Sequence, residues 1–99
     1  MTGIMIYSAV HFKNLANKLA QQLLKSEKCL VLLPTKFMLD DPYHISCRDN
    51  DTYMEIDKDK LKLVDYLYVI NTYGFLDWDT ITIVEKARQL NIKVKYIEM

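Results

Sequence analysis

The sequence is poor in residues that break regular structure or cross-link a chain. Its 99 residues include two glycines, two prolines and two cysteines. Two cysteines form one disulfide at most, and a chain of this length buries a core without such a link. We therefore expect Cys29 and Cys47 to be free thiols, the first in the core and the second at the surface.

Long apolar runs and an excess of one charge are also absent. Residues 1–7 carry no basic lead and too short an apolar run for a signal peptide, and no stretch is long enough to span a bilayer. Lys+Arg and Asp+Glu are balanced at 13 each, so the totals predict no nucleic-acid partner and no membrane partner. These features predict a cytoplasmic protein with a single domain, residues 1–99.

The scarcity of glycine and histidine excludes further kinds of site. The segment from Tyr7 to His11 has no glycine, whereas flavin and dinucleotide sites need glycine for close approach of the backbone to phosphate. His11 and His44 lie in different loops without the spacing of metal ligands. The acidic residues between Asp40 and Asp59 lack the order of a calcium-binding loop, and we interpret them as solvated surface. The sequence predicts no metal ion and no cofactor.

Apolar residues recur with the periods of strands and helices in alternation. They predict strands at 4–7, 29–33, 66–71 and 92–97, and helices at 12–26, 53–64 and from Asp77 or Asp79 to about Gln89. The 29–33 run is apolar on both faces, which is typical of strands inside parallel sheets. Alternating strands and helices imply right-handed crossovers. The predicted fold is a small three-layer α/β domain, flavodoxin-like or Rossmann-like, with a mainly parallel four-stranded sheet.

The middle of the chain is its least regular part. Residues 34–51 hold both prolines and are expected to form a long loop. Thr52 and Glu55 fit a capping box, so we expect Thr52 to be the N-cap of the 53–64 helix. This helix is expected to place one set of residues on a single side: Tyr53, Ile56, Lys60 and Val64.

The stretch from Tyr66 to Thr80 joins a buried strand to the acidic start of a helix. Ligands bind α/β sheets at the carboxyl ends of the strands, so this stretch shares a rim with residues 8–12 and 34–37. Asp77 and Asp79 have two readings: either one caps the helix, or a carboxylate binds sugar hydroxyls or activates a leaving group. Trp78 is either a dimer contact or a wall on which a base stacks.

Several segments keep the order and spacing of a known pattern. They are the loop Ser8-Ala9-Val10-His11-Phe12, the strand end Val31-Leu32-Leu33-Pro34, Lys60 with Asp65, the strand end Val69-Ile70-Asn71, the loop Gly74 to Thr80, the helical Ile83-Val84-Glu85-Lys86-Ala87 and the strand end Tyr96-Ile97-Glu98. On these segments the chain resembles the nucleoside 2-deoxyribosyltransferase-like family, especially its small, uncharacterised branch. The resemblance implies a nucleoside or nucleotide ligand, and oligomers whose pockets form near subunit contacts.

The departures from the family pattern fall on chemically important positions. Ile83 occupies the position of the family's nucleophilic Glu, and an isoleucine cannot attack an anomeric carbon. In the first loop Ser8, Ala9 and His11 replace the family's Gly, Ser and Arg, and Asp77 replaces its second Gly. Glu85, two residues after Ile83, is turned roughly 200° around the helix and is a poor substitute.

The sequence thus predicts a degenerate domain that binds a nucleoside, nucleotide or ribosyl ligand. The expected pocket consists of Ser8, His11, Phe12, Asn71, Tyr73, Gly74, Asp77 and Thr80. In it, Gly74 allows a tight turn, Thr80 and the helix N-terminus donate to an anionic group, and protonated His11 replaces the family's Arg.

Two alternatives stay open. One is an active N-glycosidase or deoxyribosyltransferase that uses Asp77 or Asp79 as its catalytic residue. The other is a protein–protein interaction module built on the aromatic residues between Tyr66 and Trp78. A homodimer or higher homo-oligomer is expected.

Overall fold

The computed structural model describes residues 1–26 and 28–99. Its strands are β1 (Thr2–Tyr7), β2 (Cys29–Leu32), β3 (Tyr66–Ile70) and β4 (Lys93–Ile97), and its α-helices are α1 (Lys13–Ser26), α2 (Cys47–Lys60) and α3 (Trp78–Gln89). Four short 3₁₀ turns are η1 (Val10–Phe12), η2 (Thr35–Met38), η3 (Leu61–Leu63) and η4 (Thr72–Gly74). The strands form one sheet in the order β2-β1-β3-β4, and every neighbouring pair is parallel. The α/β fold with a parallel four-stranded sheet is confirmed.

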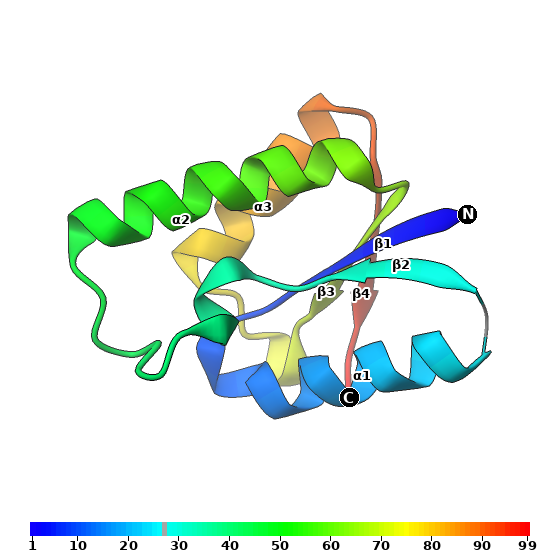
Figure 1. The fold of residues 1–99 in the computed structure, drawn as a ribbon, viewed down its shortest axis with the longest axis horizontal. Helices are drawn as coiled ribbons and strands as arrows, with labels where there is room; N and C mark the ends of the chain where they lie inside the picture. Colours follow the sequence, from blue (N-terminus) through cyan, green and yellow to red (C-terminus); the bar gives the residue numbers. More distant parts are fainter. Residues whose placement is uncertain (27) are drawn as a thin grey trace.

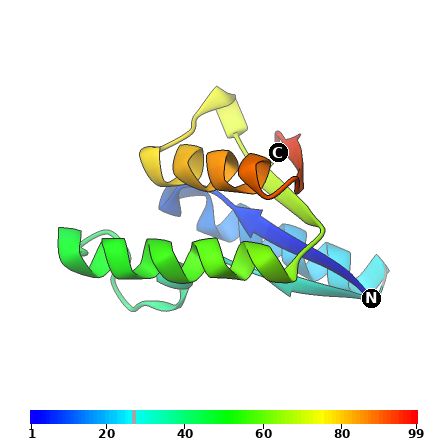
Figure 2. The same cartoon turned by 90° about the horizontal axis from the view of Figure 1, so that it is seen from above.

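The sheet is the middle of three layers. Helix α1 lies on one side, and α2 and α3 lie on the other (Figure 1). The turned view shows α2 and α3 side by side (Figure 2). This arrangement follows from strand geometry, because alternate residues of β1 point to opposite faces. Met5 and Tyr7 join the core under α2 and α3, whereas Ile4 and Ile6 join the core under α1.

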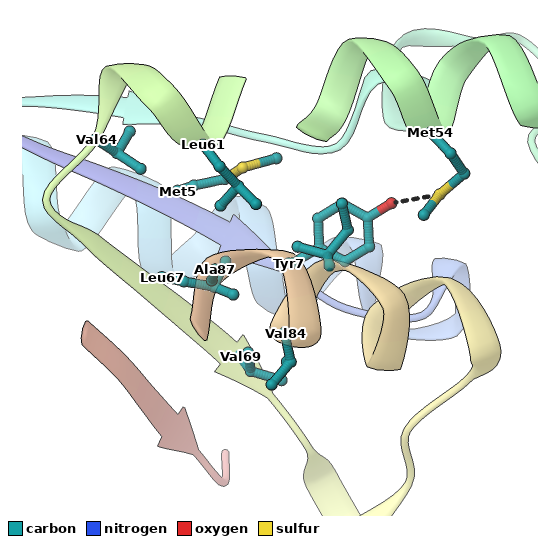
Figure 3. Close-up of a cluster of buried hydrophobic side chains, with 10 residues drawn as sticks. Met5, Tyr7, Met54, Leu61, Val64, Leu67, Val69, Val84 and Ala87 are labelled. Carbon is teal, nitrogen blue, oxygen red and sulfur yellow. Dashed lines mark hydrogen bonds between the residues drawn. The ribbon is translucent and has the colours of Figure 1, made fainter. Parts of the chain in front are cut away.

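The larger core lies between the sheet and the helices α2 and α3 (Figure 3). Leu61, Leu67, Val69 and Ile83 in this core are all 0% exposed. Burying such a side chain contributes about 1.5–3 kcal/mol each, so this layer supplies a large part of the folding free energy. Ile83 is therefore a core residue of α3.

Strand β2 differs from the expectation of an interior strand. It pairs only with β1 and forms an edge of the sheet, and its Leu30 is 41% exposed. The apolar run alone could not reveal this position, since the order of strands depends on the handed crossovers and not on one segment's composition. The central strands are β1 and β3, whose carboxyl ends therefore lie side by side.

Helix α2 begins earlier than expected, and the Thr52 capping box is wrong. Ser46 is the N-cap, and its hydroxyl accepts a hydrogen bond from the Asp49 N–H. Thr52 lies within the helix, where its hydroxyl donates to the Arg48 carbonyl at 3.3 Å. Ser46 and Thr52 are both suitable N-cap residues. A helix that begins after Ser46 is longer by more than a turn and gains the backbone hydrogen bonds of that turn. The long loop is correspondingly shorter and contains η2.

The buried side of α2 is also different from the one expected. Met54 and Asp57 face the core, while Ile56 is 42% exposed. Tyr53 and Ile56 indicated the wrong buried face of the helix. The face that is buried carries a carboxylate, Asp57, where an apolar residue is usual, so its pattern was not recognised.

Cys29 is buried and Cys47 exposed, and both are free, as expected. Within residues 1–26 and 28–99, no helix is both long and apolar enough to cross a membrane.

Candidate functional site

The central pair of strands creates a topological switch point. After β1 the chain passes to α1 on one side of the sheet, and after β3 it passes to α3 on the other side (Figure 1). The two exit loops therefore separate at the carboxyl edge. In open parallel sheets such a crevice is where ligands bind.

A hollow of about 430 Å³ lies where these two loops meet, and its lining is mainly apolar. The residues that line it are His11 and Phe12 from the loop after β1, and Thr72, Tyr73 and Phe75 from the loop after β3. The His11 and Phe12 rings lie edge-on to the Phe75 ring, with centroids 6.2 Å and 6.0 Å away. The hollow thus offers ring faces and edges and few charges.

The loop after β3 is bent by two consecutive left-handed residues. Tyr73 has φ 58° and Gly74 has φ 72°. Glycine adopts this conformation freely, as expected for Gly74, but tyrosine does so at a cost of roughly 1–2 kcal/mol. The Tyr73 side chain is 92% exposed, so packing against its own chain does not explain this strain. Strained residues of this kind concentrate at functional sites.

Two expected pocket residues are buried. Ser8 is 0% exposed, and its hydroxyl donates to the neighbouring Ala9 carbonyl at 3.0 Å. Thr80 is also 0% exposed, and its hydroxyl has no hydrogen-bond partner among the described residues. Neither side chain lines the hollow.

Asn71 lies between these extremes. It is half-buried just after β3, and its Oδ1 is buried without a partner in the described part of the chain. Its backbone carbonyl accepts the Gly74 N–H at 2.7 Å, which closes the turn.

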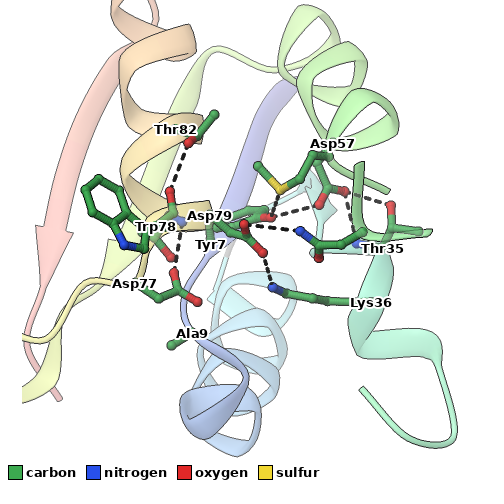
Figure 4. Close-up of polar contacts among 12 residues, drawn as sticks. Tyr7, Ala9, Thr35, Lys36, Asp57, Asp77, Trp78, Asp79 and Thr82 are labelled. Atoms are coloured by element: carbon green, nitrogen blue, oxygen red, sulfur yellow. Dashed lines mark hydrogen bonds and ion pairs between the residues drawn. The ribbon is translucent and has the colours of Figure 1, made fainter. Parts of the chain in front are cut away.

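Asp77 caps α3. Its Oδ1 accepts the Thr80 N–H at 2.9 Å, which confirms the expectation that one of the two aspartates caps this helix (Figure 4). The Thr80 N–H is therefore already engaged in the helix cap. The expected donation from Thr80 and the helix N-terminus to an anionic group stays a prediction. Trp78, the next residue, is 82% exposed.

Asp79 forms an ion pair with Lys36 at 2.6 Å (Figure 4). The Lys36 side chain is 7% exposed and that of Asp79 22% exposed. Asn50 approaches the other carboxylate oxygen at 3.4 Å. The pair joins the loop after β2 to the first turn of α3, across the carboxyl edge of the sheet.

A second polar network was missed by the sequence reasoning. Asp57 is 1% exposed, so its assignment to solvated surface is wrong. Its carboxylate accepts hydrogen bonds from the Tyr7 hydroxyl at 2.9 Å and from the Thr35 hydroxyl and N–H at 2.7 Å and 3.0 Å (Figure 4). Lys60 Nζ lies 3.5 Å away. Asp57 lies three residues after Met54 and four before Leu61, which places it on the same helix face as these apolar residues. This spacing was the available sequence signal that Asp57 is buried.

Burial is the main cause that raises the pKa of the Tyr7 hydroxyl above its usual range, and the Asp57 carboxylate raises it further. The phenol therefore stays protonated and acts as a hydrogen-bond donor.

In the described segments, no three His, Cys, Asp or Glu side chains come together as ligands. Glu85 is exposed on α3, two residues beyond the buried Ile83. The structure thus brings together His11, Phe12, Tyr73 and Gly74 at the surface of the rim, while Asp77 and Asp79 are engaged in contacts within the protein.

No protein-family model and no curated protein matches this chain.

Proposed function

We propose that the chain binds a nucleoside through the hollow between the β1 and β3 loops. The observation that carries this proposal is the ring-lined hollow at the switch point of the sheet. A planar base fits such a lining, because aromatic rings stack on a base or pack against its edges. The resemblance to nucleoside deoxyribosyltransferase-like proteins supports the same ligand class.

The charges at the carboxyl edge of the sheet favour a nucleoside over a nucleotide. Asp79 neutralises the charge of Lys36, and Asp77 accepts the hydrogen bond of the Thr80 N–H. The start of α3 therefore presents two carboxylates where a phosphate would need cations or free N–H groups. Among the residues that line the hollow, His11 carries the single basic side chain.

The same contacts favour binding over catalysis. Asp77 and Asp79 each hold a structural partner, and buried Ile83 occupies the position of the family's nucleophile. The expected alternative, an active N-glycosidase or deoxyribosyltransferase, would require one of these carboxylates to leave its partner.

Titration calorimetry with a panel of nucleosides and their 5′-monophosphates tests the proposal. We expect at least one nucleoside to bind and its monophosphate to bind more weakly. Phe75→Ala should lower the affinity by about tenfold or more, since ring stacking on a base is worth about 1–3 kcal/mol. Tyr96→Ala is the matched control, because Tyr96 is 43% exposed and Phe75 47% exposed but Tyr96 lies on β4. No heat of binding at millimolar nucleoside would refute the proposal.

A protein–protein contact at the same rim is a second candidate. Trp78 is 82% exposed, Tyr73 92% and Phe75 47%, and large exposed aromatic side chains are enriched at interfaces. Light scattering distinguishes the two proposals. A dimer that Trp78→Ala converts to a monomer would favour an interface, whereas a monomer that binds nucleoside would favour the pocket.

A further inference from the structure

Part of one sheet face, at the start of β3 and β4, borders an open hollow. Helix α1 packs chiefly on β1 and β2, and the first residues of β3 and β4 on the same face lie beside it. A hollow of about 460 Å³ occupies this area. Its lining residues are Thr2, Ile4, Tyr66, Tyr68, Lys93 and Lys95. Parallel sheets usually bury both faces, so this open area is unusual for the fold.

The hollow is built from two rows of paired residues. Tyr66 is the cross-strand neighbour of Lys93, and Tyr68 is the neighbour of Lys95. Residues two apart on a strand share a face, so both tyrosines and both lysines point to the same side. The tyrosine ring centroids are 6.3 Å apart, and the Lys95 ammonium lies 5.6 Å from the Tyr68 ring. The two tyrosines are half-buried and the two lysines exposed.

This side of the molecule is basic, although the whole chain is neutral. Helix α1 contains three lysines and no acidic residue, and Lys93 and Lys95 extend this positive charge along the strands. Asp65, the acidic residue next to Tyr66, accepts the Gly3 N–H at 2.9 Å. A second copy that presented the same face would bring Lys93 and Lys95 against their own counterparts. The charges therefore favour an anionic occupant.

We propose that this face binds single-stranded nucleic acid. Unpaired bases stack on Tyr66 and Tyr68, and the phosphates between them contact Lys93, Lys95 and the lysines of α1. Aromatic residues on a sheet flanked by positive charge are a general solution for single strands, because every unpaired base has a free ring face. A duplex hides those faces. The site lies toward the amino ends of β3 and β4, so it is independent of the nucleoside hollow at the carboxyl edge.

Fluorescence anisotropy with a fluorescein-labelled 12-nucleotide oligo(dT) tests this proposal on the full chain. We expect saturable binding in 50 mM salt that weakens as salt rises, and weaker binding to a duplex of the same length. Lys93→Gln/Lys95→Gln should lower the affinity about tenfold. Tyr66→Leu/Tyr68→Leu should lower it at least as much, with circular dichroism to confirm that both variants are folded.

Two controls separate this site from others. Lys58→Gln/Lys62→Gln removes two lysines that lie in α2 and η3, on the other side of the sheet, and should leave the affinity within twofold. Phe75→Ala, which tests the nucleoside hollow, should leave oligonucleotide binding unchanged. The proposal fails if no binding occurs at 100 µM protein, or if the lysine and tyrosine variants bind like the original protein. It also fails if poly-glutamate displaces the oligonucleotide at equal charge concentration, because charge alone would then explain binding.

Discussion

At the scale of single residues, the Tyr7 hydroxyl connects β1, one of the two central strands, to α2. It donates to Asp57, a carboxylate that is 1% exposed. A buried carboxylate is costly unless its oxygens are hydrogen-bonded, and here Tyr7 and Thr35 supply those bonds. Because burial and Asp57 raise the pKa of Tyr7, folding holds a proton that the unfolded chain releases in base.

This linkage predicts a loss of stability in alkaline solution. Above the ordinary tyrosine pKa of about 10, the unfolded state binds fewer protons at this position than the folded state. The free energy of unfolding should then fall by up to about 1.4 kcal/mol per pH unit from this group. Urea unfolding between pH 8 and 11 measures the slope. Tyr7→Phe should be less stable at pH 8 but lose stability less steeply above pH 10; equal slopes would contradict the assignment.

Replacing each of the two glycines with alanine is expected to lower stability to a different extent. A Cβ at Gly3 would lie 2.9 Å from the Leu63 carbonyl oxygen and 3.0 Å from Val64 Cα, which are backbone atoms that cannot rotate away. A Cβ at Gly74 meets nothing within 4 Å, so only its positive φ opposes substitution. We expect Gly3→Ala to destabilise by about 1–3 kcal/mol through overpacking and Gly74→Ala by about 1 kcal/mol through strain. Urea midpoints compare the two variants, and the reverse order would contradict this reasoning.

At the scale of elements, the start of α2 can be tested by its caps. Ser46→Ala removes the side chain that accepts the Asp49 N–H and should cost about 1 kcal/mol. Thr52→Ala, the matched control, replaces a residue inside the helix with a better helix former and should be neutral or slightly stabilising. Thermal unfolding measures both. A larger loss of stability from Thr52→Ala than from Ser46→Ala would indicate that Thr52, and not Ser46, is the N-cap.

The elements themselves were largely predictable, and their environments were not. The apolar periods of α1 and β3 are strong because each buries a regular stripe or an alternating face, and local sequence records that pattern. The edge position of β2 and the buried side of α2 depend on contacts with distant segments. Asp57 shows the reason: its partners Tyr7 and Thr35 are 50 and 22 residues away in the chain.

The candidate site divides in the same way. The shared rim of the strand exits follows from parallel topology and was predictable. The meeting of the β1 and β3 loops depends on the sheet order β2-β1-β3-β4, which the sequence alone did not predict. The roles of the side chains at this rim were not predictable either, because Ser8 and Thr80 turn inward and Lys36 is neutralised by a residue 43 positions away. Polar type and loop position do not determine whether a side chain meets solvent or another segment.

At the scale of the whole molecule, the layers separate charge. Helix α1 has three lysines and no acidic residue, whereas α2 has five acidic and three basic residues. The sheet lies between them, so a net charge of zero becomes a basic side and a more acidic side. Sequence totals predict no attraction to polyanions, but attraction depends on the local field. The proposed nucleic-acid face is a property of the fold and not of the composition.

The ion pair between Lys36 and Asp79 links two segments across the carboxyl edge of the sheet, and we expect it to contribute to the free energy of unfolding. Removing one partner leaves the other charge nearly buried, so Asp79→Asn should destabilise by roughly 2–3 kcal/mol, near the lower end for buried pairs because Asp79 is 22% exposed. Lys36→Met should cost a similar amount. The double variant Lys36→Met/Asp79→Asn should lose clearly less than the sum, since no charge is then left without its partner. Urea unfolding of all four proteins gives the coupling energy, and simple additivity would show that the pair contributes no specific stabilisation.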